Sequence, residues 1–569
     1  MTMKKLILAS VSAVALMAAA SNVSAQVATQ TLNQSGSNNN ATIGQTVAAG
    51  GANVTSNVTQ SGGNNAAEVS QTGTAEAGAA SKVTIRQFSN SDAAAPAGGN
   101  STKGNLAKAT QSGGVNNTIT IRQGSADEAK NGNSAEATQV GSNNTATITQ
   151  NSTDGYASLS QNGSDNTASI SQSDSLSSPD NDPYAVVSQT GDGNNAEVKQ
   201  TSSGGALGYI SAEVTQLGDG GSATVTQEVT SAMSSGLSAT VTQNGAATAT
   251  VTQKISASQK NDNAGGRDLS ATVTQSENNT ATVTQVMNDT WPRNGANAPY
   301  SYEATVEQTG DNNTATVSQF DASPDAPDRE LTASVTQSGN DNEATINQSS
   351  LRSDATIVQS GSGNEATIRQ NLVESGRTGN NEALLTQSGN QNLSILSQEG
   401  NRNNIDVTQA GSGIGAKSAV VYVTQAVDSR LALATVNQTD SSTNGYVNVR
   451  QTGDKSPVGS PSANRLTNPL KNSVDVTQSA ANNRAEVNQD GVDNYTKISQ
   501  SGDGAVADVN QSGTNNSLLM NQTGDRAYSL VNQTGTDGSL TINQYADDAS
   551  STVTQGGANN VAVITQGTP

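Results

Sequence analysis

Apolar and polar residues alternate along short stretches that recur through almost the whole chain. In residues 139–150, which read QVGSNNTATITQ, every second residue from Asn144 to Gln150 falls on one face (Asn, Ala, Ile, Gln), and three threonines fall on the other. A period of two is typical of a β-strand, and Val, Ile and Thr suit its pleated surface. Between the strands, residues such as Gly141 and Asn143 tolerate the positive φ of a tight turn. Each unit therefore predicts one short strand and one turn.

Glutamine closes these units at a nearly constant spacing. From Gln478 to Gln566 a glutamine occurs every 11 residues, and about 40 such glutamines lie between Gln34 and Gln566. One short strand cannot bury a face alone, but copies stacked at the inter-strand distance of about 4.8 Å can. The period therefore predicts an all-β fold in which strands stack on copies of themselves.

The irregular spacings indicate how the strands are connected. Between Gln87 and Gln398 every second interval stays at 10 to 12 residues, whereas the others vary and reach 24 residues between Gln87 and Gln111. Insertions on every second turn are expected when two strands form one rung of a flattened β-solenoid, with tight turns along one edge and loops along the other. About 40 strands then predict about 20 two-strand rungs.

Three stretches depart from this alternation. The longer intervals from Gln45 to Gln60 and from Gln71 to Gln87 are in the opposite phase, and the two steps between Gln425 and Gln451 are 13 residues each. Two explanations fit the opening phase: the first rungs are built differently, or a strand near residues 93–100 lacks its glutamine.

The inward face of each strand predicts columns of like residues. Alanine and Val or Ile form the apolar columns, while Gln and Asn stack over identical partners and pair their side-chain amides as ladders, which satisfies them although they are buried. The candidate ladder residues are Gln139, Asn144, Gln150, Gln161, Asn166, Gln172, Gln308, Asn313, Gln319, Gln337, Asn342, Gln348, Gln478, Gln489, Asn494, Gln500, Gln511, Asn516, Gln522, Gln555, Asn560 and Gln566.

Composition excludes several classes of protein. Only 32% of the residues are hydrophobic and 2% aromatic, too few for an ordinary globular core, and the strict period argues against a flexible low-complexity polymer. A net charge of −21 disfavours binding to nucleic acid or to an anionic membrane surface. The chain has no cysteine and no histidine, which removes thiolate and imidazole ligands, nucleophiles and bases. We predict no catalytic, cofactor-binding or metal-binding residues.

The first 25 residues have the pattern of a secretory signal peptide. Lys4 and Lys5 precede an apolar run from Leu6 to Ala20, and Val23-Ser24-Ala25 forms a cleavage site before Gln26. A membrane anchor is the alternative, but the run is shorter than a spanning helix, and no other segment reaches that length. We therefore expect a signal peptide at 1–25, a repeat region at 26–569, a secreted protein, and no membrane span in the mature chain.

The longer insertions carry most of the prolines and the single tryptophan. They lie at 288–302 with Trp291, at 321–329, and at 454–471. Because proline cannot donate a hydrogen bond to a strand ladder, we expect these segments to lie outside the stack, as tolerated surface insertions rather than as partner-binding loops.

The unit Q-x-G-x-x-N-x-A-x-[VI]-x-Q resembles the curlin repeat of the curli fibre subunits. The matching residues in three units are Gln60, Gly62, Asn65, Ala67, Val69 and Gln71; Gln308, Gly310, Asn313, Ala315, Val317 and Gln319; and Gln555, Asn560, Ala562, Ile564 and Gln566. The resemblance covers nearly the whole predicted mature chain, although the family usually has only a handful of repeats.

This resemblance implies a structural subunit of an extracellular amyloid fibre that supports biofilm matrix, adhesion and aggregation. It also implies export through the outer membrane of a Gram-negative cell, with a nucleator subunit and curli-type secretion machinery as partners. The final residues, Thr565 to Pro569, lack the basic residues expected of a nucleator, which favours the major subunit.

Other functions remain open on the sequence. A monomeric ice-binding or adhesin solenoid would use the Thr-x-Thr pairs at residues 240 and 242, 250 and 252, 272 and 274, and 282 and 284, although charged residues interrupt their array. Calcium could bind near Asp192, Asp219 and Asp503, but the calcium-binding repeat of β-rolls is absent. An enzyme would need paired carboxylates or a basic residue fixed in one groove, and the acids follow no such pattern.

The ends of the repeat region favour assembly. The last strand, within residues 559–566, and the first, near Ala28, show neither a helix nor a proline-rich cap. Uncapped strand edges are expected to add further copies end to end, which would give a filament.

Overall fold

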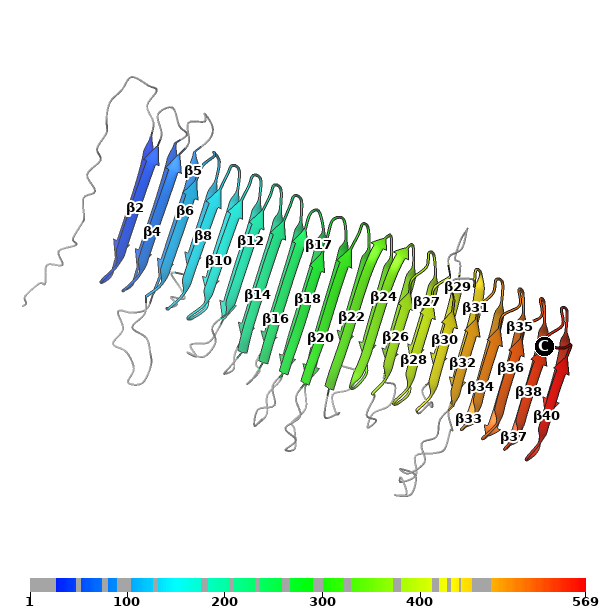
Figure 1. Cartoon of the computed structure of the whole chain (residues 1–569). Helices are drawn as coiled ribbons and strands as arrows, with labels where there is room; N and C mark the ends of the chain where they lie inside the picture. Colours follow the sequence, from blue (N-terminus) through cyan, green and yellow to red (C-terminus); the bar gives the residue numbers. More distant parts are fainter. Residues whose placement is uncertain are drawn as a thin grey trace, which may run out of the picture.

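The chain forms a long stack of β-strands in two layers, as the computed structural model shows (Figure 1). The residues that it describes are 27–47, 53–73, 80–89, 104–125, 131–174, 183–203, 208–230, 235–257, 267–289, 300–320, 329–371, 380–411, 419–426, 431–439, 442–452 and 472–569. Within them lie forty strands, arranged as twenty rungs of two strands each. The predicted all-β solenoid is confirmed.

Odd-numbered strands form one sheet and even-numbered strands form the other. The odd strands are β1 (Ala28–Ser35), β3 (Val54–Ser61), β5 (Ser81–Phe88), β7 (Thr118–Gln123), β9 (Thr145–Asn151), β11 (Thr167–Asp174), β13 (Asn195–Ser203), β15 (Ser222–Thr230), β17 (Thr248–Ala257), β19 (Thr280–Asp289), β21 (Thr314–Phe320), β23 (Glu343–Ser349), β25 (Glu365–Asn371), β27 (Leu393–Gln398), β29 (Ala419–Gln425), β31 (Gly445–Thr452), β33 (Arg484–Val492), β35 (Val506–Thr514), β37 (Tyr528–Thr536) and β39 (Ser550–Gln555).

The even strands are β2 (Asn40–Val47), β4 (Ala66–Gly73), β6 (Leu106–Ser112), β8 (Ser134–Val140), β10 (Tyr156–Asn162), β12 (Tyr184–Thr190), β14 (Gly208–Leu217), β16 (Ser235–Asn244), β18 (Arg267–Gln275), β20 (Tyr300–Thr309), β22 (Arg329–Asn340), β24 (Ser353–Ser362), β26 (Glu382–Gln387), β28 (Asn404–Gln409), β30 (Leu433–Gln438), β32 (Ser473–Gln478), β34 (Tyr495–Gln500), β36 (Ser517–Gln522), β38 (Ser539–Gln544) and β40 (Val561–Gln566).

Each strand pairs in parallel with the strand two places along the chain, and like residues stand over like residues. In β9 and β11, for example, Ala146 pairs with Ala168, Ile148 with Ile170 and Gln150 with Gln172. A slip of one residue would turn every inward side chain outward, so the buried pattern sets the register.

The core is two apolar columns from each sheet, packed face to face. Alanine occupies one inward position and Val, Ile or Leu the next, and residues such as Ala146 and Ile148 are fully buried. The threonines that separate them in sequence are half-buried on the outer surface. Small alanines on both inner faces allow the sheets to lie close together, so an inward column of apolar residues forms although the composition contains few of them.

A second apolar cluster widens the middle of the stack, and the sequence analysis did not predict it. Ile210, Leu237, Leu269, Tyr302 and Leu331 replace the buried asparagine at the start of even strands β14 to β22. They pack with three residues that lie two positions after the glutamines of β15, β17 and β19, namely Val229, Ile255 and Met287. The strands of this section are correspondingly long, mostly 9 to 12 residues.

The longer connections lie on opposite edges in different parts of the stack. In Figure 1 the even strands end at the upper edge, where even strands lead to odd ones. From β6 to β27 that edge has the tight turns, as predicted, whereas after β2, β4 and β28 it has longer connections. Strand β4 pairs directly with β6, and Gln71 bonds to Gln111, so no further strand stands between β4 and β6 in the even sheet. The first rungs simply carry their insertions on the other edge.

Tight turns use the residues that tolerate a left-handed backbone. Gly141 has φ +107° and Asn143 φ +60°, and asparagine or aspartate occupies the equivalent position of many other turns. Asparagine and aspartate adopt this conformation at lower cost than other side-chain-bearing residues.

Several predictions fall on residues outside those described. They are the signal peptide at 1–25, the insertions around Trp291, Pro324 and Pro457, and the segment at 93–100. Among the residues that are described, no helix has the length and apolar character needed to cross a membrane.

Replacing Gly141 by alanine tests the close stacking of the turns. A Cβ there would lie 2.0 Å from the carbonyl oxygen of Gly163 on the next rung, whereas a Cβ on Gly193, also at positive φ, has nothing within 4 Å. We expect Gly193→Ala to cost about 1 kcal/mol of stability from backbone strain, and Gly141→Ala to cost clearly more. Urea unfolding followed by circular dichroism measures both, and equal losses would contradict the stacking.

Candidate functional site

Two continuous ladders of glutamine run through the interior, one in each sheet. In the odd sheet the Nε2 of each glutamine from Gln34 to Gln533 donates to the Oε1 of the next glutamine in the stack. The even sheet repeats this from Gln45 to Gln544, whose acceptor is Gln566. The N–O distances span 2.6 to 3.1 Å in the odd sheet and 2.7 to 3.2 Å in the even sheet.

The same amide groups also tie the two sheets together. Gln150 Nε2 lies 3.1 Å from the carbonyl oxygen of Ser134 and 2.9 Å from that of Gly155, besides its bond of 2.9 Å to Gln172. Because a backbone carbonyl can only accept, these contacts determine which end of the amide carries the hydrogens. Gln150 therefore links its sheet to the opposite one as well as to the next rung, and most other ladder glutamines make the same kind of carbonyl contact.

The buried asparagines bond mainly to the backbone of the turns. Asn166 Nδ2 donates to the Gly191 carbonyl at 2.7 Å, and its Oδ1 accepts the Asn194 backbone N–H at 2.9 Å. Its amide also lies 3.1 Å from the Oδ1 of Asn144. These asparagines thus hold successive turns in register through hydrogen bonds to the backbone. The sequence had predicted only pairing between their side-chain amides.

The structure places the predicted ladder residues in these two arrangements. Gln139, Gln161, Gln308, Gln337, Gln478, Gln500, Gln522 and Gln566 belong to the even ladder; Gln150, Gln172, Gln319, Gln348, Gln489, Gln511 and Gln555 belong to the odd ladder; and Asn144, Asn166, Asn313, Asn342, Asn494, Asn516 and Asn560 lie at the turns. All are buried except Asn560 and Gln566, which are partly exposed on the last rung.

Inward hydroxyl groups bridge the two ladders, and the sequence analysis missed them. Thr496 Oγ1 donates to Gln511 Oε1 at 2.6 Å, and Ser529 Oγ donates to Gln544 Oε1 at 2.8 Å. Ser56 bonds to Gln71 in the same way. These residues take the place of the inward alanine, four positions before a ladder glutamine. A serine or threonine at that position in the sequence would have predicted the bridge.

Charged groups on the outer surface form separate pairs rather than one site. A hydrogen bond from Arg526 lowers the pKa of Asp548, and a hydrogen bond to Glu136 raises the pKa of Lys108. Burial raises the pKa of Asp406. Active sites gather perturbed groups in one place, whereas these three lie on widely separated rungs.

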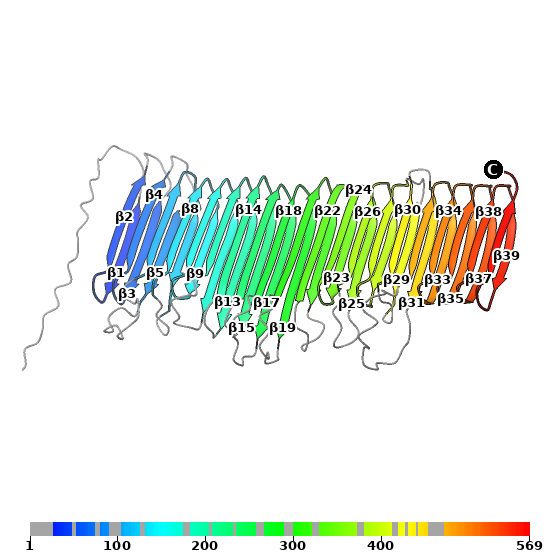
Figure 2. The same cartoon turned by 60° about the horizontal axis from the view of Figure 1, so that its bottom comes forward.

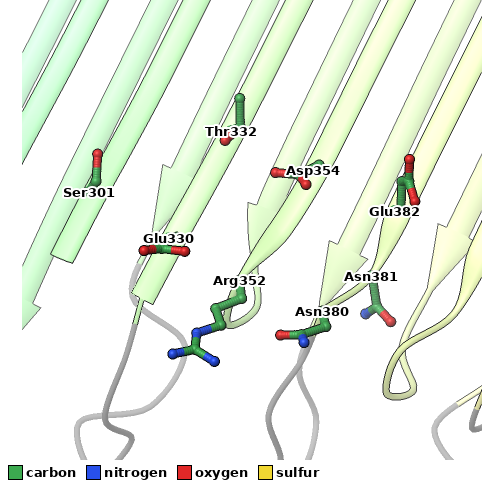
Figure 3. Close-up of a pocket in the computed structure, with 8 residues that line it drawn as sticks. All are labelled: Ser301, Glu330, Thr332, Arg352, Asp354, Asn380, Asn381 and Glu382. Carbon is green, nitrogen blue, oxygen red and sulfur yellow. The ribbon is translucent and has the colours of Figure 1, made fainter. Parts of the chain in front are cut away.

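A shallow depression on the even sheet is lined by polar side chains (Figure 3). It is lined by Ser301, Glu330, Thr332, Arg352, Asp354, Asn380, Asn381 and Glu382. Asp354 and Glu382 are direct neighbours on paired strands, and Asn404 donates to Glu382 at 2.9 Å. Asp354 and Glu382 thus lie side by side on the outer face of one sheet, not on opposite sides of a cleft, whereas glycoside hydrolysis uses two carboxyl groups that flank the scissile bond.

The threonine pairs considered for ice binding do not form one face. Thr240, Thr242, Thr272 and Thr274 lie on even strands β16 and β18, whereas the pairs at 250 and 252 and at 282 and 284 lie on odd strands β17 and β19. Opposite sheets present them to opposite sides of the stack. The array on each side is thus half as large as the sequence suggested.

The aspartates considered for calcium accept backbone hydrogen bonds in the turns. Asp192 accepts the Ser164 N–H at 2.6 Å, Asp219 accepts the Asp192 N–H at 2.7 Å, and Asp503 accepts the Ala481 N–H at 3.1 Å. No group of three acidic side chains suited to a metal occurs in the described parts of the chain.

The first and last rungs have strand edges that no described strand covers. Strands β1 and β2 pair only with β3 and β4, and β39 and β40 only with β37 and β38. Figure 2 shows these rungs at the two ends of the stack. The apolar core is incompletely covered at the same places, through Ala41 and Ile43 at one end and Val553, Ala562 and Ile564 at the other.

Exchanging one ladder glutamine for glutamate tests the need for an amide. Gln319→Glu removes the donor to Gln348 and to two carbonyl groups and places a charge among acceptors, so we expect a loss of about 3 kcal/mol or more at pH 7. Burial would raise the pKa of the introduced carboxyl group, so the deficit relative to the original protein should shrink as pH falls toward about 4.

Gln391→Glu provides the matched control, because Gln391 is exposed in a turn. Urea unfolding at pH 7 and pH 4 measures all three proteins. Equal stability of Gln319→Glu and Gln391→Glu at pH 7 would show that the ladder amide does not matter.

Comparison with known proteins supports the repeat that the structure displays. A family model described as curlin associated repeat matches residues 379–411 and 471–502. Each match spans three strands, β26–β28 and β32–β34, in which the ladder glutamines are 11 residues apart without insertions. No match was found among curated proteins. The chain thus carries segments similar to the curlin associated repeat at residues 379–411 and 471–502, and strands that end in a ladder glutamine recur along the rest of the described stack.

Proposed function

We propose that this protein is a secreted structural subunit of an extracellular curli-like amyloid fibre. The observation that carries the proposal is the in-register parallel stack whose end rungs keep uncovered strand edges and uncovered core residues. A stack of this kind is already a cross-β arrangement within one chain. Adding another copy at an end would extend both sheets, both ladders and the core.

Growth at the ends of the stack is energetically favoured over growth at its sides. Each uncovered edge presents backbone N–H and C=O groups that a further strand can pair, as exposed edges do in aggregating proteins. The sides carry the outward residues, and a net charge of −21 over the chain makes unspecific side-by-side contact repulsive. End-to-end assembly therefore gives a filament rather than an amorphous aggregate.

We infer the biological role from the curlin-like repeats and from the predicted signal peptide. We propose a structural role without catalysis, in a fibre at the cell surface that supports biofilm matrix, adhesion and aggregation. The partners of this role are further copies of the chain, a nucleator subunit, and curli-type secretion machinery in a Gram-negative outer membrane. Within such a fibre we propose the position of the major subunit.

Fibre formation by the purified mature chain is the direct test of this proposal. At micromolar concentration we expect a lag, then thioflavin fluorescence, and fibres that diffract at a spacing of about 4.8 Å along their axis. Gln391→Glu should form fibres at the same rate, because its added charge is far from both ends. A chain that stayed monomeric for days, even with fragmented fibres as seeds, would contradict the proposal.

Processing at the N-terminus tests the proposed export separately. We expect the protein recovered outside the cell to begin at Gln26, because Val23-Ser24-Ala25 fits signal-peptide cleavage. Intact-mass spectrometry of the extracellular fraction gives the N-terminal residue. Recovery of the chain only with Lys4 and Lys5 present, in the membrane fraction, would support an uncleaved anchor instead.

A further inference from the structure

Two pairs of tyrosines lie ring to ring on the outer faces of the described stack. On the even sheet, the rings of Tyr156 in β10 and Tyr184 in β12 have their centroids 5.2 Å apart and their planes only 13° from parallel. On the odd sheet, the centroids of Tyr422 and Tyr446 lie 6.1 Å apart, and the planes meet at 61°. The first pair is therefore stacked, on two strands that lie side by side in Figure 1.

The register of the even sheet holds the stacked pair in place. Tyr156 and Tyr184 are direct partners in the pairing of β10 with β12. The backbone carbonyl oxygen of Tyr156 accepts from Gln172 Nε2, and that of Tyr184 accepts from Gln200 Nε2, each at 2.9 Å. The ladder of the opposite sheet thus fixes the backbone of both tyrosines, while their rings lie on the outer surface.

The two stacked rings are accessible and have room to turn. Tyr156 is 37% exposed and Tyr184 44% exposed. Their other register neighbours are small, Ser134 on one side and Ser211 on the other. Because the terminal torsion of a tyrosine has a broad energy minimum, each ring can turn about its Cβ–Cγ bond until ortho carbons of the two rings meet. This movement leaves the core undisturbed.

The pair on the odd sheet lacks these properties. Tyr422 and Tyr446 are only partly exposed. The edge of one ring is directed at the face of the other, so their ortho carbons do not face each other. The guanidinium carbon of Arg484 lies 5.8 Å from the centroid of Tyr446, and burial raises the pKa of the Tyr446 phenol. The stacked pair on the even sheet is thus the better placed of the two for a reaction between rings.

We propose that Tyr156 and Tyr184 form an oxidative modification site, at which a peroxidase and hydrogen peroxide join the two rings in a dityrosine cross-link. The link connects two neighbouring rungs covalently in a chain that has no cysteine for a disulfide. It closes the loop from residue 156 to residue 184, and it restricts the unfolded chain as a disulfide would. The inference depends on a contact within one chain and not on fibre formation.

The chemistry of the link is a coupling of two phenoxyl radicals. The peroxidase removes one electron and one proton from each phenol, and hydrogen peroxide is reduced to two molecules of water. One carbon–carbon bond then forms between an ortho carbon of Tyr156 and an ortho carbon of Tyr184. The hydrogens of these two carbons move to the two oxygens, which restores both phenols. Holding the rings together makes this step effectively unimolecular, so it competes well with coupling between chains.

Peptide mapping of the oxidised chain tests the site. The folded mature chain is treated with a haem peroxidase and hydrogen peroxide, and each link should remove the mass of two hydrogen atoms. Cleavage before aspartate places Tyr156 in a peptide of residues 154–164 and Tyr184 in a peptide of residues 182–191. We expect these two peptides to be recovered joined, with the fluorescence of dityrosine.

An equal mixture of unlabelled and isotope-labelled chains shows whether the link lies within one chain. Joined peptides should be wholly unlabelled or wholly labelled, in monomers and in fibres alike. Joined peptides in which one half is labelled would show coupling between chains and would contradict the proposed geometry.

Tyrosines at the same strand position provide matched controls. Tyr156→Phe and Tyr184→Phe should each lower the yield of dityrosine about tenfold or more, because one phenol of the pair is gone. Tyr495→Phe and Tyr528→Phe should leave the yield unchanged, because these tyrosines are each 39% exposed but have only serine or valine as register neighbours. Ser473→Tyr, which places a second tyrosine beside Tyr495, should add a further link.

Unfolding in urea tests whether the link stabilises the stack. The linked chain should need a higher urea concentration to unfold than the untreated chain, and Tyr156→Phe treated in the same way should show no shift. An unchanged midpoint in the linked chain would contradict the stabilising role. Links spread evenly over all tyrosines, or an undiminished yield in Tyr156→Phe, would contradict the site itself. Failure of the chain to form fibres would overturn the proposed function and leave this site standing.

Discussion

Burial of a side-chain amide between two sheets is acceptable only when its donors and its acceptor are all satisfied. In this chain the partner of each ladder glutamine is another glutamine one rung away, and the carbonyl groups of the opposite sheet take the remaining hydrogens. That requirement forces like residues to stack, sets the parallel register and keeps the sheets at a constant separation. The alanine and valine columns fill the space that this geometry leaves.

The connections are free to vary because they take no part in this arrangement. A step of 40 residues from Gln71 to Gln111 and a step of 22 residues from Gln139 to Gln161 end in bonds of 2.7 and 2.8 Å. Insertions can move from one edge to the other, as they do after the first rungs, without disturbing a single ladder bond. The interior of the solenoid therefore requires a fixed pattern of residues, whereas its edges accept connections of different length.

Local departures from the repeat are compensated within the same plan. Where aliphatic residues and Tyr302 replace the turn asparagine, longer strands add a second apolar layer. Where serine or threonine replaces alanine, as at Thr496, the hydroxyl finds a glutamine of the opposite ladder. The second exchange keeps the buried hydroxyl and amide groups hydrogen-bonded, which is the condition that the interior imposes. At the first rung Gln45 Oε1 is buried without a hydrogen-bond partner among the described residues, and this links the fold to assembly.

Period-two alternation and the spacing of glutamines were sufficient to predict the strands, the two-strand rung, the number of rungs and the pairing of like residues. These follow from sequence because each strand is specified by residues adjacent in the chain and each rung repeats the last. The edge on which the first insertions lie, the backbone partners of Asn166, the second core around Leu269 and the common direction of the amide bonds depend on contacts across the sheets. Such contacts join residues whose relative placement no local pattern encodes, so they emerged only when the rungs were stacked in three dimensions.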